Sequence, residues 1–336
     1  MAGMRLALLQ LSYSRLRDMK IYQAYMNAQQ EDFVCADAIP FDASANNAPD
    51  TREYELFKRI HADPSLHEGD EPWGLVSWKF EHKSPVSFGE FHDFCQSAFA
   101  SGADCAFINP MIGNEAVYAN VWEQGIHCAH TGIEKVAYFL EEKMGIHVAS
   151  VSDVSTFAFC NYFVAKPRFW ERYFEFIEVA LALLDAEAAG GTEVGQIYSG
   201  SGQYERDESA SMRIFVIERL FSSFLLRQDG LRIAACTPDA AGFDAKFGVR
   251  LGALLWNLSR MKQRAVAADD LSLYKIWDGL RTSMLADWQI NMVWNLDDPA
   301  TYTLSREHQE FRAICAELFD GPGQATAPLQ QGATCR

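Results

Sequence analysis

Several well-known catalytic motifs are missing from this 336-residue chain. It contains no G-x-x-x-x-G-K-[ST] phosphate loop, no G-x-G-x-x-G, no H-E-x-x-H, no G-x-S-x-G and no D-x-D. These absences argue against a P-loop NTPase, a dinucleotide dehydrogenase and a zincin metalloprotease.

Positive charge is also scarce. Lys and Arg number 29 against 45 Asp and Glu, which gives a formal net charge of −16. An acidic chain repels polyanions, so nucleic acid is not an expected partner. A nucleotide-sized anion is still allowed, because one or two Lys or Arg side chains, or a helix N-terminus, can bind a phosphate.

The cysteines and apolar runs indicate the cellular compartment. The eight cysteines are scattered without a C-x-x-C pair, and several lie in apolar runs where a reduced thiol packs as a small hydrophobe. The apolar stretch at residues 6–11 is far shorter than the ~18 residues of a membrane span. We therefore expect a cytoplasmic protein with no transmembrane segment and no export signal.

Strand and helix patterns alternate over the first half of the chain, and helical patterns dominate after residue 209. Strands are predicted at residues 5–11, 33–39, 73–80, 104–109, 147–151 and 157–165, and helices at 16–29, 51–61, 87–100, 131–143, 169–189 and 212–226. This pattern predicts an α/β domain over residues 1–205, a helical region packed on it over 206–320, and a flexible tail over 321–336. Residues 190–209 contain five glycines and are predicted to form a loop, a candidate lid.

Local signals mark three helix starts. Ser87-x-x-Glu90 and Thr131-x-x-Glu134 have the spacing of a capping box. Pro167 is placed where the first position of a helix favours proline.

The segment 73–125 holds polar groups at predicted strand ends, where open α/β sheets bind ligands. Lys79 lies between Trp78 and Phe80, and Asn109 precedes Pro110. A ligand site is one interpretation. The other is a lysine extended along an edge strand and an ordinary Asn-Pro turn.

Residues 120–125, N-V-W-E-Q-G, place Trp122, Glu123 and Gln124 beside each other. Aromatic faces with amides and carboxylates suit sugar recognition. The alternative is a helix end with Gly125 as its cap, and the sequence leaves both open.

His127, Cys128 and His130 are too few for a recognised metal site, so no metal is predicted there. Contact between His127 and a diphosphate is the more reasonable role. Asn161 interrupts an apolar run, and a buried Asn either satisfies backbone groups or faces a ligand.

Glu218 and Arg219 fall within an apolar helix, where charge is costly unless it is paired or borders a site. A half-buried carboxylate beside a site is a suitable general base, which makes Glu218 the leading candidate. Alternatively, each residue has its own ion-pair partner.

In order and spacing, the segments GLVSWKF, FINP, NVWEQG, CNYFVAKPRFW and IERLF resemble those of uncharacterised bacterial proteins encoded with surface-polysaccharide assembly enzymes, whose layout looks like that of GT-A-type glycosyltransferases. The resemblance implies a GT-A-like mixed sheet flanked by helices, with strand ends lining a nucleotide-sugar site. It covers roughly residues 53–226 and would assign Lys79, Asn109, Trp122, Glu123 and Asn161 to the donor and acceptor site, with Glu218 near the reacting hydroxyl. The missing D-x-D puts a divalent metal in doubt.

The resulting hypothesis is a glycosyltransferase that moves a sugar from a nucleotide-sugar donor to a bacterial polysaccharide or lipid-linked glycan. Glu218 or Glu123 would be the base, and Lys79 with Arg219 or His127 would receive the diphosphate charge. One alternative is a carbohydrate-binding or scaffold protein without catalysis. Another is a different transferase or a hydrolase that acts on sugars and uses Glu123 and Glu218 as a carboxylate pair.

Overall fold

The computed structural model describes residues 19–291, apart from 47–49, 68, 128–129, 203–209 and 228–229. The chain divides into two compact units, Met1–Thr282 and Ser283–Arg336. Of the second unit, only the helical residues 283–291 are described. Within the described part, no helix is both long and apolar enough to span a bilayer. The strand predicted at 5–11 and the tail predicted at 321–336 lie outside it.

The first unit is built on a six-stranded sheet with the order β2-β1-β3-β5-β4-β6. β5 runs antiparallel to its neighbours β3 and β4, whereas the other pairs are parallel. The strands are β1 (Lys20–Tyr25), β2 (Ile39–Asp42), β3 (Trp73–Ser77), β4 (Cys105–Ile108), β5 (Tyr162–Ala165) and β6 (Ile233–Cys236).

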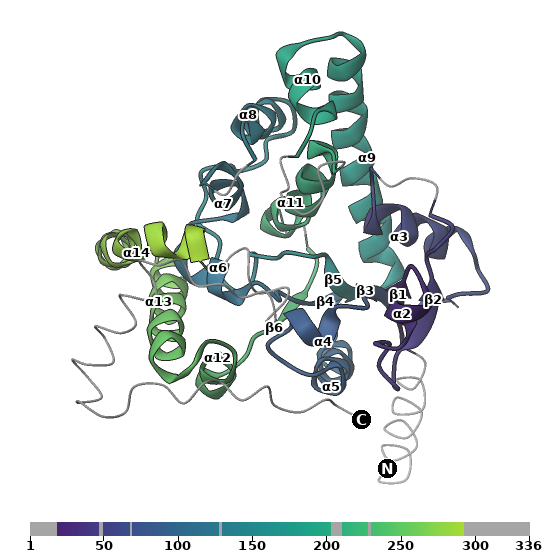
Figure 1. Cartoon of the computed structure of the whole chain (residues 1–336), viewed down its shortest axis with the longest axis horizontal. Helices are drawn as coiled ribbons and strands as arrows, with labels where there is room; N and C mark the ends of the chain where they lie inside the picture. Colours follow the sequence, from purple (N-terminus) through teal and green to yellow (C-terminus); the bar gives the residue numbers. More distant parts are fainter. Residues whose placement is uncertain are drawn as a thin grey trace. The chain divides into compact units, whose positions relative to one another are not determined.

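Helices lie against both faces of this sheet (Figure 1). On one side lie α4 (Phe80–Lys83) and α5 (Phe88–Ala100), and on the other α3 (Glu53–Ala62), α9 (Pro167–Ala189) and α11 (Met212–Arg227). The remaining helices are α2 (Ala28–Glu31), α6 (Ile112–Val117), α7 (Val121–His127), α8 (Ile133–Met144), α10 (Glu193–Ser199), α12 (Ala240–Phe247), α13 (Val249–Ala268) and α14 (Leu271–Asn291). This mixed sheet flanked by helices confirms the predicted fold class, and it is consistent with a GT-A-like fold.

Alternation along β5 supplies the core on both faces, since successive strand residues point to opposite sides. Tyr162 and Val164 join the cluster formed with α5. Phe163 points the other way, where its ring stacks on Phe221 of α11 at 4.3 Å and lies 4.7 Å from Trp170 of α9. The aromatic pattern of residues 157–165 is thereby divided between two layers.

Two of the predicted helix starts are confirmed. Ser87 caps α5 in a capping box: its side chain accepts the Glu90 N–H, and the Glu90 carboxylate accepts the Ser87 N–H. Pro167 is the first residue of α9. The second predicted capping box is wrong, because the residue that precedes α8 is Gly132, which has no capping side chain, at φ 90°.

Four segments differ from the predicted elements. Residues 20–25, predicted as helix, form β1, a strand between β2 and β3. The strand predicted at 33–39 is displaced to β2, and only the last part of the strand predicted at 157–165 forms β5. Residues 147–151 form no strand, because the carbonyls of Val148 and Ser150 accept hydrogen bonds from the Asn120 side chain instead.

The later part of the chain contains two further differences. The glycine-rich segment 190–209 includes helix α10, which begins after Thr192, and residues 203–209 lie outside the described part. The region predicted to be helical after residue 205 contributes β6, which pairs with β4. The sheet therefore draws on residues from 20 to 236.

Candidate functional site

Two strand ends and one strand start meet at a single edge of the sheet. Ile108 of β4 pairs with Tyr162 of β5, and Leu75 of β3 pairs with Phe163. Because β5 is antiparallel, its amino end lies beside the carboxyl ends of β3 and β4. The hydroxyls of Ser77 and Tyr162 share a hydrogen bond across this edge. The predicted residues Lys79, Asn109 and Asn161 follow or precede these strand ends, so the edge brings them to one region.

The backbone at this edge is strained. Cys160 and Asn161 have φ values of 63° and 51°, and Arg52 has a φ of 41°. Positive φ is uncommon outside glycine, and such strain collects at functional sites. Arg52 precedes Glu53, on which the charges of Glu218 and Lys83 also act, so three of the four non-glycine residues with positive φ in the described part are near this edge. Glu218 supports the strained turn, since its Oε1 accepts the Cys160 N–H at 2.7 Å.

Charged side chains from three helices surround the turn. Lys83 of α4 places its Nζ 3.8 Å from the Cys160 Sγ. Burial raises the pKa of Glu53 at the start of α3, and the negative charge of Glu218 adds to this, while Arg52 and Lys83 oppose it. We name Glu53, Lys83, Cys160 and Glu218 the strand-end cluster.

Lys246 of α12, from a distant part of the chain, forms hydrogen bonds beside the strand-end cluster. Its Nζ donates to the carbonyl of Lys83 and, at 3.1 Å, to that of Pro110. One ammonium group thus connects the segment that follows β4 with α4.

Burial raises the pKa of the Tyr162 hydroxyl, and the charge of Lys83 opposes the rise.

Two buried polar atoms here lack hydrogen-bond partners. The Asn109 Oδ1 accepts from the Met111 N–H at 3.0 Å, but its Nδ2 has no partner. The Oδ1 of Asn161 has none either. Asn109 and Asn161 are 3% and 5% exposed, so both atoms carry the cost of desolvation. A donor and an acceptor are therefore left for a polar group at this edge.

An exposed aromatic patch lies beside the cluster. Phe33 is 48% exposed, and its ring lies 5.5 Å from that of Trp78 and 5.2 Å from that of His82. The Nζ of Lys79 lies 5.2 Å from the Trp78 ring centroid. Lys79 precedes α4 instead of continuing the predicted strand, which ends at Ser77.

Trp122, Gln124 and Arg219 lie in the interior instead. The Arg219 guanidinium donates to the Val121 carbonyl at 2.9 Å and to Gln124 Oε1 at 2.6 Å. The Trp122 indole N–H donates to Ser223 at 3.0 Å. Arg219 is 1% exposed, and these bonds join α7 to α11 in the interior of the first unit.

Gly125 has a different role from the predicted helix cap, since it lies inside α7. A Cβ on Gly125 would lie 2.6 Å from the Arg219 Nε. We expect Gly125→Ala to lower the free energy of unfolding by about 1–3 kcal/mol, because the buried guanidinium has no room to move. Urea unfolding measures the loss. The control Gly89→Ala, on α5 with nothing within 4 Å, should be neutral or stabilising, and equal effects of the two changes would contradict the argument.

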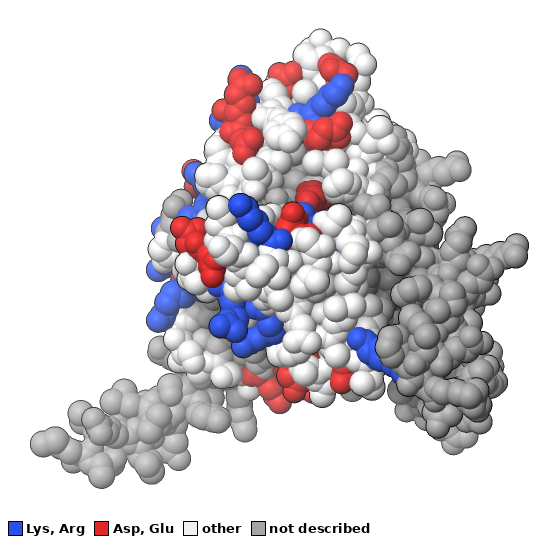
Figure 2. All heavy atoms as spheres, turned by 90° about the vertical axis from the view of Figure 1, so that its left-hand side faces the viewer, with Lys and Arg blue, Asp and Glu red and all other residues white. Residues whose placement is uncertain are grey.

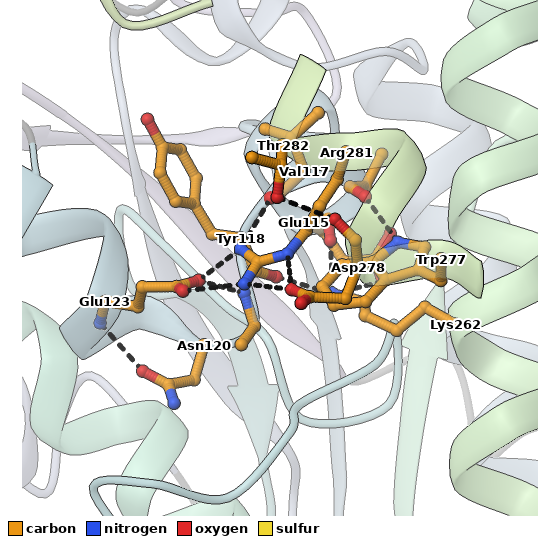
Figure 3. A network of polar contacts seen from close by, with 12 residues as sticks. Glu115, Val117, Tyr118, Asn120, Glu123, Lys262, Trp277, Asp278, Arg281 and Thr282 are labelled. Carbon is orange, nitrogen blue, oxygen red and sulfur yellow. Dashed lines mark hydrogen bonds and ion pairs between the residues drawn. The ribbon is translucent and has the colours of Figure 1, made fainter. Parts of the chain in front are cut away.

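Glu123 belongs to a second network, shown in Figure 3. Its carboxylate accepts hydrogen bonds from Nη1 and Nη2 of Arg281, at 2.7 and 2.9 Å, and from the Ala119 N–H. Asn120 Oδ1 accepts the Glu123 N–H at 2.8 Å. These bonds join α7 to α14, so Glu123 has a stabilising role that requires no substrate.

His127 is exposed at the last position of α7, and Cys128 lies outside the described residues. His130 is buried against Phe215, and its Nδ1 is hydrogen-bonded to the Gly202 carbonyl at 2.7 Å. Across the described residues, no group of three or more His, Cys, Asp or Glu is arranged to hold a metal ion.

Burial, with a smaller contribution from the charge of Arg219, lowers the pKa of His130 to about 3. In the unfolded chain the pKa is about 6.5. Between these values only the unfolded state binds the proton, so stability falls as the pH falls. From pH 7 to pH 5, the native chain should lose about 2 kcal/mol more than His130→Asn, which keeps a donor for Gly202. Urea unfolding at both pH values tests this, and equal losses would refute it.

No family model matches the chain, and no curated protein gives a significant match. Among solved structures, the chain is similar to WbbM, a bifunctional glycosyltransferase in its apo form. The TM-score is 0.40 and the sequence identity 14%. The similarity covers 65% of this chain and 44% of the WbbM chain, so this chain spans less than half of that protein's length. At this TM-score, any functional conclusion depends on the geometry of the site.

Sequence patterns did not single out Glu53, Lys83 or Lys246. Lys83 lies one helical turn beyond Lys79, which is a signal that helix spacing offers. Glu53 is the first residue of α3, a position that acidic residues favour for capping alone. Lys246 reaches the edge from α12, and no local pattern indicates that contact.

Proposed function

We propose that this chain is a glycosyltransferase that moves a sugar from a nucleotide-sugar donor to an acceptor hydroxyl of a bacterial polysaccharide or lipid-linked glycan. The observation that carries the proposal is the strand-end cluster, in which two carboxylates and a lysine surround a strained turn. The cluster lies at the carboxyl ends of parallel strands, where open α/β sheets bind ligands.

Each group of the cluster has a suitable chemistry. In transfer, the acceptor oxygen bonds to the anomeric carbon, the bond to the diphosphate breaks, and a base takes the hydroxyl proton. Glu218 is the proposed base, because it is half-buried and the Cys160 N–H fixes its orientation. Glu53 is the second candidate, since burial raises its pKa and so makes its carboxylate a stronger base.

Donor binding would use the neighbouring groups. Lys83 and Lys79 supply positive charge for the leaving diphosphate. The patch of Phe33, Trp78 and His82 offers rings on which a nucleobase can stack, with those of Phe33 and His82 exposed and that of Trp78 half-buried. The unsatisfied atoms of Asn109 and Asn161 suit a hydroxyl group, which both donates and accepts.

Thermal unfolding with a panel of nucleotides and nucleotide sugars tests the proposal. A specific ligand at about 100 times its Kd should add about 2.7 kcal/mol of stability. Lys83→Gln should reduce the shift, whereas Lys143→Gln, on the exposed side of α8, should not. A shift for no nucleotide or nucleotide sugar would refute the proposal. A shift without release of nucleoside diphosphate in the presence of glycan acceptors would favour a binding protein without turnover.

A further inference from the structure

Helix α13 differs from the rest of the chain in its charge. Its twenty residues include four basic side chains and no Asp or Glu, although the chain as a whole has a net charge of −16. One of them, Lys262, is fully buried beside Glu115. The other three, Arg250, Arg260 and Arg264, are exposed.

Helical spacing places these arginines on the side of α13 that faces away from the core. The inward side is defined by Leu255 and Leu258, which are 0% and 1% exposed. Arg260 and Arg264 are four residues apart and so share a face. Figure 2 looks onto the side that carries α13 and α14, and basic side chains gather there left of its centre.

The same two helices expose apolar side chains. Of the twelve large hydrophobic residues that are exposed in the described part of the chain, six lie on α13 and the start of α14. They are Val249 at 71%, Leu254 at 45%, Val266 at 39%, Leu271 at 64%, Ile276 at 55% and Leu280 at 48%. A concentration of this kind marks an interaction surface more often than isolated exposed residues do.

Acidic groups near this surface are already engaged in local structure. The Asp270 carboxylate accepts the N–H groups of Ser272 and Leu273 at the start of α14. Asp278 is paired with Arg281 at 2.7 Å. Asp269 ends α13 and is exposed. Within residues 249–282, three aspartates therefore stand against four exposed basic side chains, the three arginines and Lys275, which leaves a small excess of positive charge.

We propose that the outward face of α13, with the exposed side chains at the start of α14, binds the surface of an anionic phospholipid bilayer. Arginines attract anionic headgroups, and neighbouring apolar side chains enter the boundary between headgroups and acyl chains. Nucleic acid would satisfy the arginines but not Leu254, Leu271 and Ile276. This inference is independent of the proposed chemistry, because it concerns a different part of the first unit.

Co-sedimentation of the full chain with vesicles tests the inference. Vesicles of phosphatidylcholine alone are compared with vesicles that also contain phosphatidylglycerol. The variant Arg250→Gln/Arg260→Gln/Arg264→Gln should bind the anionic vesicles about 100-fold more weakly, at roughly fivefold per arginine. The control Lys135→Gln/Lys143→Gln/Arg172→Gln removes the same charge from α8 and α9 and should bind as the native chain does.

A second variant tests the apolar contribution. Leu254→Ser/Ile276→Ser should weaken binding to anionic vesicles while circular dichroism and thermal unfolding stay unchanged, because both side chains are exposed. Three results would overturn the inference: no binding to anionic vesicles, equal loss in the α13 variant and its control, or binding to single-stranded RNA but not to vesicles.

Discussion

Replacing Glu218 with glutamine is expected to lower kcat/KM for sugar transfer by about 10²–10⁴-fold, the usual contribution of a general base. Glutamine keeps a carbonyl oxygen, so the bond from the Cys160 N–H, now 2.7 Å long, can persist. The turn and the donor's Kd should therefore be retained. What the variant loses is the ability to take a proton from the acceptor.

Release of nucleoside diphosphate gives kcat and KM, and thermal unfolding with the donor gives its affinity. Glu142→Gln, which alters an exposed carboxylate on α8, serves as the control and should leave both unchanged. If Glu218→Gln retains full turnover while Glu53→Gln loses it, the base is Glu53. If both retain it, the strand-end cluster does not perform the proton transfer.

Lys262→Met is expected to lower the free energy of unfolding by about 3–5 kcal/mol. The Lys262 Nζ lies 2.9 Å from Glu115 Oε1 and donates to the Tyr118 carbonyl at 3.0 Å (Figure 3). Both side chains of the ion pair are 0% exposed, and the ammonium lies over the Trp277 ring. Burial lowers the pKa of Lys262, and Glu115 opposes this. Methionine fills the space but leaves the Glu115 carboxylate buried without its partner.

Urea unfolding at pH 7 measures this loss. The double variant Glu115→Leu/Lys262→Met should recover most of it, because replacing a whole buried pair with apolar groups is often neutral or stabilising. Lys275→Met, on the exposed side of α14, is the control and should change stability by less than about 0.5 kcal/mol. A loss below about 1 kcal/mol for Lys262→Met would contradict the argument.

Sequence patterns located elements whose local signals agree with their packing. The capping box at Ser87, the proline that begins α9 and the β-favouring run of β3 are examples. The prediction failed at β1 because its four central residues, 21–24, are all buried, and a strand that is buried on both faces has no alternating polar face. The displaced β2 has only one buried residue, so its pattern is weak.

For the candidate site, sequence identified strand ends but not the environment of each side chain. Glu123 and Glu218 are both acidic residues in helical, largely apolar segments, yet one is bound by Arg281 from α14 and the other by the Cys160 amide. Those partners lie 158 and 58 residues away along the chain. Only tertiary structure distinguishes a carboxylate that stabilises the fold from one available for chemistry.

The pairing of β6 with β4 has a consequence for the growing chain on the ribosome. β4 has the sequence CAFI, and all four of its side chains are buried. Until residues 233–236 have been synthesised, one side of β4 has unpaired N–H and C=O groups beside apolar side chains. Such an open edge pairs readily with other chains. A fragment that stops at residue 205 is therefore expected to aggregate when expressed alone.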